Sequence, residues 1–184
     1  AACDLRLDDL LADTRGLLLI LMPPRNRQKL GPIIAKLTDA APGALWLGAT
    51  MPRRGDDRRK LVELTCLATH HDVPLIATND VLYHHPDRRM LQDVLTCIRE
   101  KTTIDKAGRK LAANAERHLK TPGEMARLFA DAPELVAAQA MLGELLVDIT
   151  KWSTQKIHVV LGTDGADRLP VNDRGVTYFA FDDD

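Results

Sequence analysis

One group of side chains in this sequence could do metal chemistry. Asp80 follows a short apolar run, Pro74 to Ala77, and His84 and His85 come shortly after it. A carboxylate with neighbouring imidazoles is a donor set that can bind zinc or manganese. If the run is a strand of a parallel sheet, Asp80 lies at its carboxyl end, where α/β proteins bind ligands. Asp80 is therefore the candidate metal ligand.

Asp80 lacks obvious partners at the ends of the neighbouring predicted strands. The residues there are Pro23 and Pro24 after one strand and Thr50 and Met51 after another, and none is a strong ligand. A hydrolytic metal site normally needs several protein ligands. The competing interpretation is structural: Thr78, Asn79 and Asp80 form a turn that caps backbone groups, with His84 and His85 on a loop surface.

Other catalytic arrangements find little support in the sequence. Ser153 is the only serine and has no G-x-S-x-G around it, and Gly162–Gly165 lacks the spacing and lysine of a phosphate-binding loop. Cys66 and Cys97 are predicted on helices near apolar faces, which does not indicate a reactive thiol. The sequence also contains two pairs of adjacent aspartates, Asp8-Asp9 and Asp56-Asp57, which we interpret as helix caps and solvated charge. We predict no catalytic residue and no polymerase active site in this chain.

The elements that position Asp80 follow a β-α-β rhythm. Continuous apolar runs predict strands at Leu17–Met22, Ala44–Ala49 and Pro74–Ala77, with helices between them. Such alternation predicts an α/β fold with parallel strands and right-handed crossovers. Three strands do not complete a usual α/β sheet, and an open strand edge is a liability. We therefore predict either marginal stability or a sheet edge covered by two later strand-like runs, Ile157–Leu161 and Val176–Phe181.

Three further helices are predicted after the third strand. The first begins near Pro86, and its apolar face is Met90, Leu91, Val94, Leu95 and Ile98. A polar, partly irregular segment follows from Lys101 to Lys120, with His118 expected on the surface. Thr121-Pro122-Gly123-Glu124 has the pattern of a capping box, and a similar pattern at Asp131 begins the last, long helix.

Composition and charge exclude some classes of protein. The chain has 184 residues and a net charge of −1, so as a whole it does not attract nucleic acid electrostatically. The longest apolar run, Gly16–Met22, is far too short to span a bilayer. Three cysteines without zinc-like spacing are typical of reduced thiols. We expect a cytoplasmic protein without membrane contact.

Two long stretches of the sequence resemble the bacterial error-prone DNA polymerases. They are LIATNDVLYHHPDRRMLQDVLTCIREKTTID, residues 75–105, and ANAERHLKTPGEMARLF, residues 113–129, with weaker similarity at residues 10–25 and 46–57. These polymerases belong to the C family, together with the alpha subunit of DNA polymerase III. The resemblance covers residues 4–136, and residues 137–184 do not share it.

The resemblance implies a fold and a damaged metal site. It places the chain in the later part of a PHP domain, a distorted β/α barrel, so that the fold class is a partial PHP-type barrel followed by helices and a short divergent α/β tail. Intact PHP sites hold zinc or manganese and carry a D-x-H motif. Here the motif reads Asp80-Val81-Leu82, and leucine cannot bind metal. Gly48 likewise offers no ligand on the second strand.

The resemblance also implies a division of the chain and a role. Residues 1–100 would be the partial PHP domain, 101–150 a helical connector toward the polymerase body, and 151–184 the divergent tail. The catalytic aspartates with their magnesium, and with them DNA binding, would belong to the full-length polymerase and not to this chain. Three hypotheses follow: a polymerase fragment acting as a structural scaffold, a PHP-type metal-dependent phosphoesterase, or a non-catalytic module that docks onto replication or repair proteins.

Overall fold

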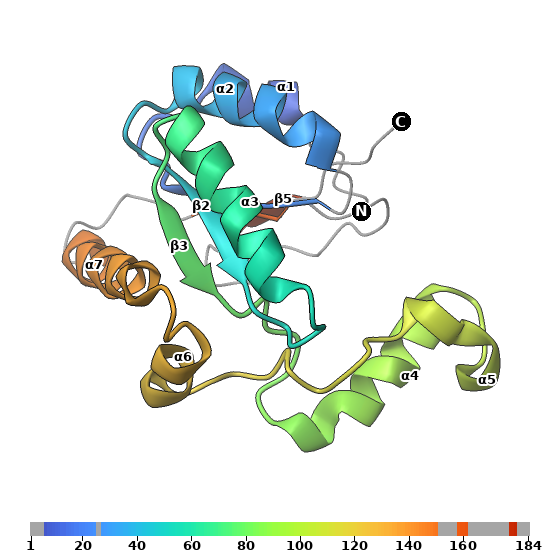
Figure 1. Cartoon of the computed structure of the whole chain (residues 1–184). Helices are drawn as coiled ribbons and strands as arrows, with labels where there is room; N and C mark the ends of the chain where they lie inside the picture. The colour runs from blue at the N-terminus through green and yellow to red at the C-terminus, as the bar shows by residue number, and fades with distance from the viewer. Residues whose placement is uncertain (1–5, 25–26, 151–157, 162–176, 180–184) are drawn as a thin grey trace.

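The computed structural model describes residues 6–24, 27–150, 158–161 and 177–179. These residues form a mixed α/β fold (Figure 1). Its elements, in chain order, are α1 (Leu7–Ala12), β1 (Leu19–Met22), the 3-10 helix η1 (Arg27–Lys29), α2 (Leu30–Ala40), β2 (Leu45–Thr50), α3 (Asp57–His70), β3 (Leu75–Thr78), η2 (Pro86–Arg88), α4 (Arg89–Arg99), α5 (Ile104–Ala107), η3 (Gly108–Lys110), α6 (Pro122–Leu128), α7 (Pro133–Thr150), β4 (His158–Leu161) and β5 (Thr177–Phe179).

The strands form one parallel sheet in the order β3-β2-β1-β4-β5. The three predicted β-α-β strands are its first three members, which confirms the α/β prediction. The two crossovers from β1 to β3 run in the same direction along the sheet, so right-handed connections place α2 and α3 on the same face. Alternate strand residues therefore meet both helices in the main core. Fully buried residues of this core include Leu19, Leu21 and Leu47 from the strands and Leu30, Ile34 and Leu37 from α2.

The open edge of β1 is covered by the strands from the end of the chain. Leu21 and Met22 pair with Val160 and Leu161 of β4, and β4 pairs in turn with β5. This arrangement confirms the prediction that the two late strand-like runs extend the sheet, over His158–Leu161 and Thr177–Phe179. Pairing satisfies backbone groups that an exposed edge would leave free for aggregation.

Helices α6 and α7 contribute to the same core. The predicted capping box is present: Thr121 Oγ1 accepts a hydrogen bond from the Glu124 amide at 3.3 Å, and Glu124 Oε2 accepts one from the Thr121 amide at 2.8 Å. The hydrogen bonds that the Thr121 amide and hydroxyl donate to the Glu124 carboxylate lower the pKa of Glu124. The start of α6 is thus fixed, and Phe129 at its end is fully buried in the main core. Helix α7 lies beside β3, the edge strand of the sheet (Figure 1).

Helix α4 differs from the other long helices because its apolar side faces solvent. The residues predicted as its apolar face are 40–76% exposed, whereas Thr96 and Cys97 are its buried residues. We call residues 86–110 the α4 arm; Figure 1 shows α4 and α5 standing away from the sheet.

Cys66 of α3 is also exposed, so its predicted place on the inward side of α3 was wrong. Within the described residues, no helix has the length and hydropathy needed to cross a bilayer.

Candidate functional site

The candidate site is the carboxyl edge of the parallel sheet, where β1, β2 and β3 end. Thr50 and Thr78 are register partners, so the loops after β2 and β3 begin side by side. The Thr78 hydroxyl donates to the Ala49 carbonyl at 3.1 Å, and it lies 3.6 Å from Sδ of Met22. A Cβ at Gly48 would collide with that sulfur atom. The space beside Gly48 of β2 is therefore filled by the apolar thioether of Met22 and not by a polar ligand.

Asp80 lies at this edge, as the sequence predicted, but its carboxylate faces a guanidinium. Asp80 Oδ2 is 2.6 Å from Nη2 of Arg117, and Arg117 Nε donates to the Asp80 carbonyl oxygen at 2.9 Å. The two side chains are 39% and 28% exposed. Asp80 also has a φ of 46°, in the left-handed region that aspartate tolerates better than most residues. The side chain and the backbone of Asp80 are thus both held by Arg117.

Asn79 connects the same turn to a segment far along the chain. Its Nδ2 donates to the carbonyl of Glu116 at 3.1 Å and to the carbonyl of His118. Backbone hydrogen bonds extend the contact: the Leu82 amide donates to the Arg117 carbonyl, and the Leu119 amide donates to the Tyr83 carbonyl, each at 2.9 Å. The residues after β3 are therefore tied to residues 116–119. This agrees with the alternative in which the turn serves backbone groups.

The histidines near Asp80 make other contacts. His85 Nδ1 accepts from the Asp87 amide at 3.4 Å and lies 3.3 Å from the Asp87 carboxylate, at the start of η2. His84 is exposed. His118 is half-buried, contrary to the predicted surface position, and its Nδ1 lies 2.8 Å from the Ala115 carbonyl oxygen. Across the described part of the chain, no three His, Cys, Asp or Glu residues are grouped so that they could hold a metal ion.

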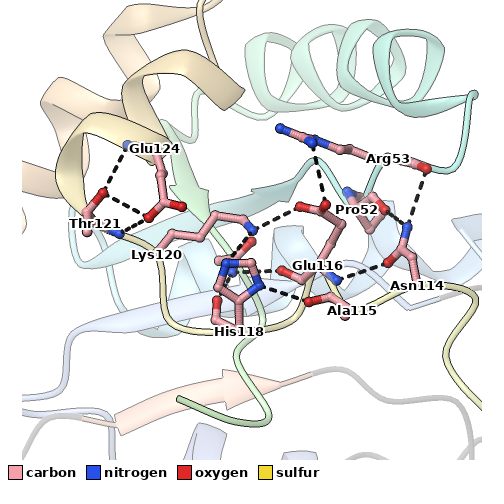
Figure 2. Close-up of polar contacts among 10 residues, drawn as sticks. Pro52, Arg53, Asn114, Ala115, Glu116, His118, Lys120, Thr121 and Glu124 are labelled. Carbon is pink, nitrogen blue, oxygen red and sulfur yellow. Dashed lines mark hydrogen bonds and ion pairs between the residues drawn. The ribbon is translucent and has the colours of Figure 1, made fainter. Parts of the chain in front are cut away.

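Residues 114–120 form a polar network over the strand ends, shown in Figure 2. Lys120 Nζ lies 2.9 Å from Glu116 Oε2, and the Lys120 side chain is only 5% exposed. Arg53, from the loop after β2, lies 3.5 Å from the other Glu116 oxygen. Asn114 Nδ2 donates to the Pro52 carbonyl at 2.7 Å. The network therefore links the loops that follow β2 and β3.

Sequence reasoning missed this network. Residues 101–120 were expected to be a polar, exposed linker, yet the side chains of Lys120 and Glu116 are only 5% and 20% exposed. The available local signal was the Glu116–Lys120 spacing, in which side chains four residues apart can pair. The partners Arg53, Pro52 and Asn79 come from distant loops. Their proximity depends on the parallel sheet, which brings the ends of β2 and β3 together.

Comparison with known proteins places most of the chain in a family, although no protein-family model matches it. An error-prone DNA polymerase from Bradyrhizobium sp. (strain ORS 278) is 57% identical over 137 residues. Those residues are 73% of this chain. This part of the chain belongs to the error-prone DNA polymerase family. Error-prone DNA polymerases from Rhodopseudomonas palustris (strain BisB5) and Brucella suis biovar 1 (strain 1330) are 56% and 50% identical over 137 and 139 residues.

The chain spans only a small part of these error-prone DNA polymerases. The aligned region is 12% of the length of the first two relatives and 13% of the third. The family assignment made from residues 75–105 and 113–129 is confirmed.

Proposed function

We propose that this chain is a structural portion of an error-prone DNA polymerase and has no nucleotidyl-transfer site of its own. The observation that supports the proposal most strongly is the 57% identity over 137 residues that are only 12% of the polymerase from Bradyrhizobium sp.. In this role the chain positions other parts of the polymerase in the cytoplasm, and contact with DNA belongs to the full-length enzyme.

The chemistry of the strand-end edge supports a scaffold role. Phosphoryl transfer depends on carboxylates that hold metal ions beside the reacting groups. At this edge the carboxylates of Asp80 and Glu116 instead face Arg117, Arg53 and Lys120. A cation beside a carboxylate competes with a metal ion for the same oxygen atoms. These residues do not fit the zinc or manganese site of an intact PHP domain, and Leu82 adds no donor atom.

Primer extension tests this proposal directly. The purified chain, mixed with primed template, the four deoxynucleotides and magnesium or manganese, is expected to extend no primer. The full-length polymerase of Bradyrhizobium sp. under the same conditions is the positive control. Metal-dependent synthesis that co-elutes with this chain in gel filtration would overturn the proposal.

Substitution of Asp80 tests whether its carboxylate has a structural role or binds metal. Asp80→Ala removes the partner of Arg117 and places alanine at a positive φ, so we expect the free energy of unfolding to fall by about 1 kcal/mol. Asp80→Asn keeps a residue that tolerates this φ and isolates the loss of charge. Elemental analysis is expected to find the same substoichiometric amounts of zinc and manganese in the unmodified chain and in both variants. Stoichiometric metal lost on Asp80→Ala would favour the phosphoesterase alternative.

A further inference from the structure

The α4 arm carries a continuous apolar surface that no described residue covers. Met90, Leu91, Val94, Leu95 and Ile98 recur at helical spacing and are 76%, 55%, 40%, 50% and 68% exposed. The opposite side of α4, with Asp93, Thr96 and Cys97, faces the protein. A helix with this pattern normally buries its apolar side. Contiguous exposed apolar surface of this kind marks interaction sites in soluble proteins.

A pocket adjoins this surface. It has a volume of about 290 Å³ and lies between α4 and the residues just before it. Leu82, Leu91 and Leu95 supply apolar walls, and Arg88 and Gln92 supply polar ones.

Tyr83 also lines the pocket, although its hydroxyl oxygen is inaccessible to solvent. The residue is 8% exposed, and its hydroxyl is buried without a hydrogen-bond partner among the described residues. Burial raises the pKa of Tyr83.

The charge of the arm indicates the chemistry of the occupant. Residues 86–110 contain seven Lys and Arg against four Asp and Glu, in a chain whose total charge is −1. Arg88, Lys106 and Arg109 are exposed, and their side chains form no ion pair with another described residue. An apolar surface on a basic arm complements an acidic, amphipathic partner. A second copy would bring an equally basic arm against this one, which disfavours self-association.

We propose that the α4 arm is a docking site for an acidic amphipathic helix of another protein. The apolar side of that helix packs on Leu91 and Leu95, and its acidic flanks face the basic side chains of the arm. This is helix-in-groove recognition. The proposal goes beyond the scaffold role and does not depend on it, because it concerns a surface outside the strand-end edge.

Fluorescence anisotropy with synthetic peptides tests the docking site. The probe is a dye-labelled amphipathic helical peptide with a leucine face and glutamate flanks; one comparison peptide has lysine flanks, and a second has serines in place of the leucines. The intact 184-residue chain is expected to bind the acidic peptide in the micromolar range, more weakly at high salt, and to bind both comparison peptides at least about tenfold more weakly. Equal binding of the lysine-flanked peptide, or no binding of the acidic one, would overturn the proposal.

Matched variants locate the binding surface. The double variant Leu91→Glu/Leu95→Glu is expected to weaken peptide binding by at least about tenfold. Val62→Glu is the control, because Val62 is 63% exposed on α3, away from the arm. Circular dichroism and urea unfolding verify that each variant is folded. Equal effects of the control and the arm variants would refute the site, as would sedimentation showing a dimer that the double variant dissociates.

Discussion

Replacing Phe129 by alanine is expected to lower the free energy of unfolding by about 3–5 kcal/mol. Phe129 directly follows α6 as its C-cap residue and is 1% exposed, in the core that also contains strand and α3 residues. Removing its ring leaves a cavity in this core, which the surrounding side chains cannot readily fill. Urea denaturation followed by circular dichroism measures the change.

The control for Phe129 lies two positions earlier on the same helix. Arg127 is exposed, so Arg127→Ala is expected to change the unfolding free energy by less than about 0.5 kcal/mol. If Phe129→Ala were equally mild, α6 would not be part of the folded core. If Phe129→Ala lowered the stability of the whole protein in a single cooperative transition, α6 would fold as one unit with the first 100 residues. The sequence had instead predicted a separate connector.

Replacing Lys120 by methionine is expected to cost about 2 kcal/mol of stability. The Lys120 ammonium group is almost completely buried and pairs with Glu116 at 2.9 Å. Its removal leaves a half-buried carboxylate with Arg53 at 3.5 Å as its remaining ion-pair partner. An uncompensated buried charge is more costly than the loss of the pair as a whole. Because Glu116 retains some exposure and one cation, the cost is below that of a fully buried pair.

A double-mutant cycle separates the ion pair from simple packing. Glu116→Gln/Lys120→Met removes both charges, and we expect it to be more stable than Lys120→Met alone. The four proteins of the cycle would be compared by urea denaturation at neutral pH. Additive costs of the two single substitutions would show that Lys120 and Glu116 do not interact.

The strands and their order in the chain could be predicted because a buried strand gives a short apolar run in the sequence. Leu19, Leu21 and Leu47 lie in short apolar runs, and such runs separated by helices are typical of parallel sheets. The start of α6 was predicted for a similar reason, since Thr121 and Glu124 cap each other within one turn. The position of Asp80 at the end of β3 also followed from this local pattern.

The environment of Asp80 could not be predicted in the same way. Arg117 is 37 residues away in the chain, and nothing near either residue indicates that they meet. Lys120 gave no signal of burial, because lysine is usually exposed and pairs only when the fold brings a carboxylate to it. The apolar pattern of α4 predicted a helix with an apolar side, but not that this side would face solvent.

The sequence by itself determined the alternation of strands and helices, the family and the capped helices, because each depends on residues that are close together in the sequence. Only the tertiary structure decided what the candidate groups do. It paired Asp80 with Arg117, buried Lys120 beside Glu116 and left Leu91 and Leu95 exposed. The physical reason is that charge pairing and burial depend on which distant segments the sheet brings together. That proximity is a property of the whole fold and not of any one stretch.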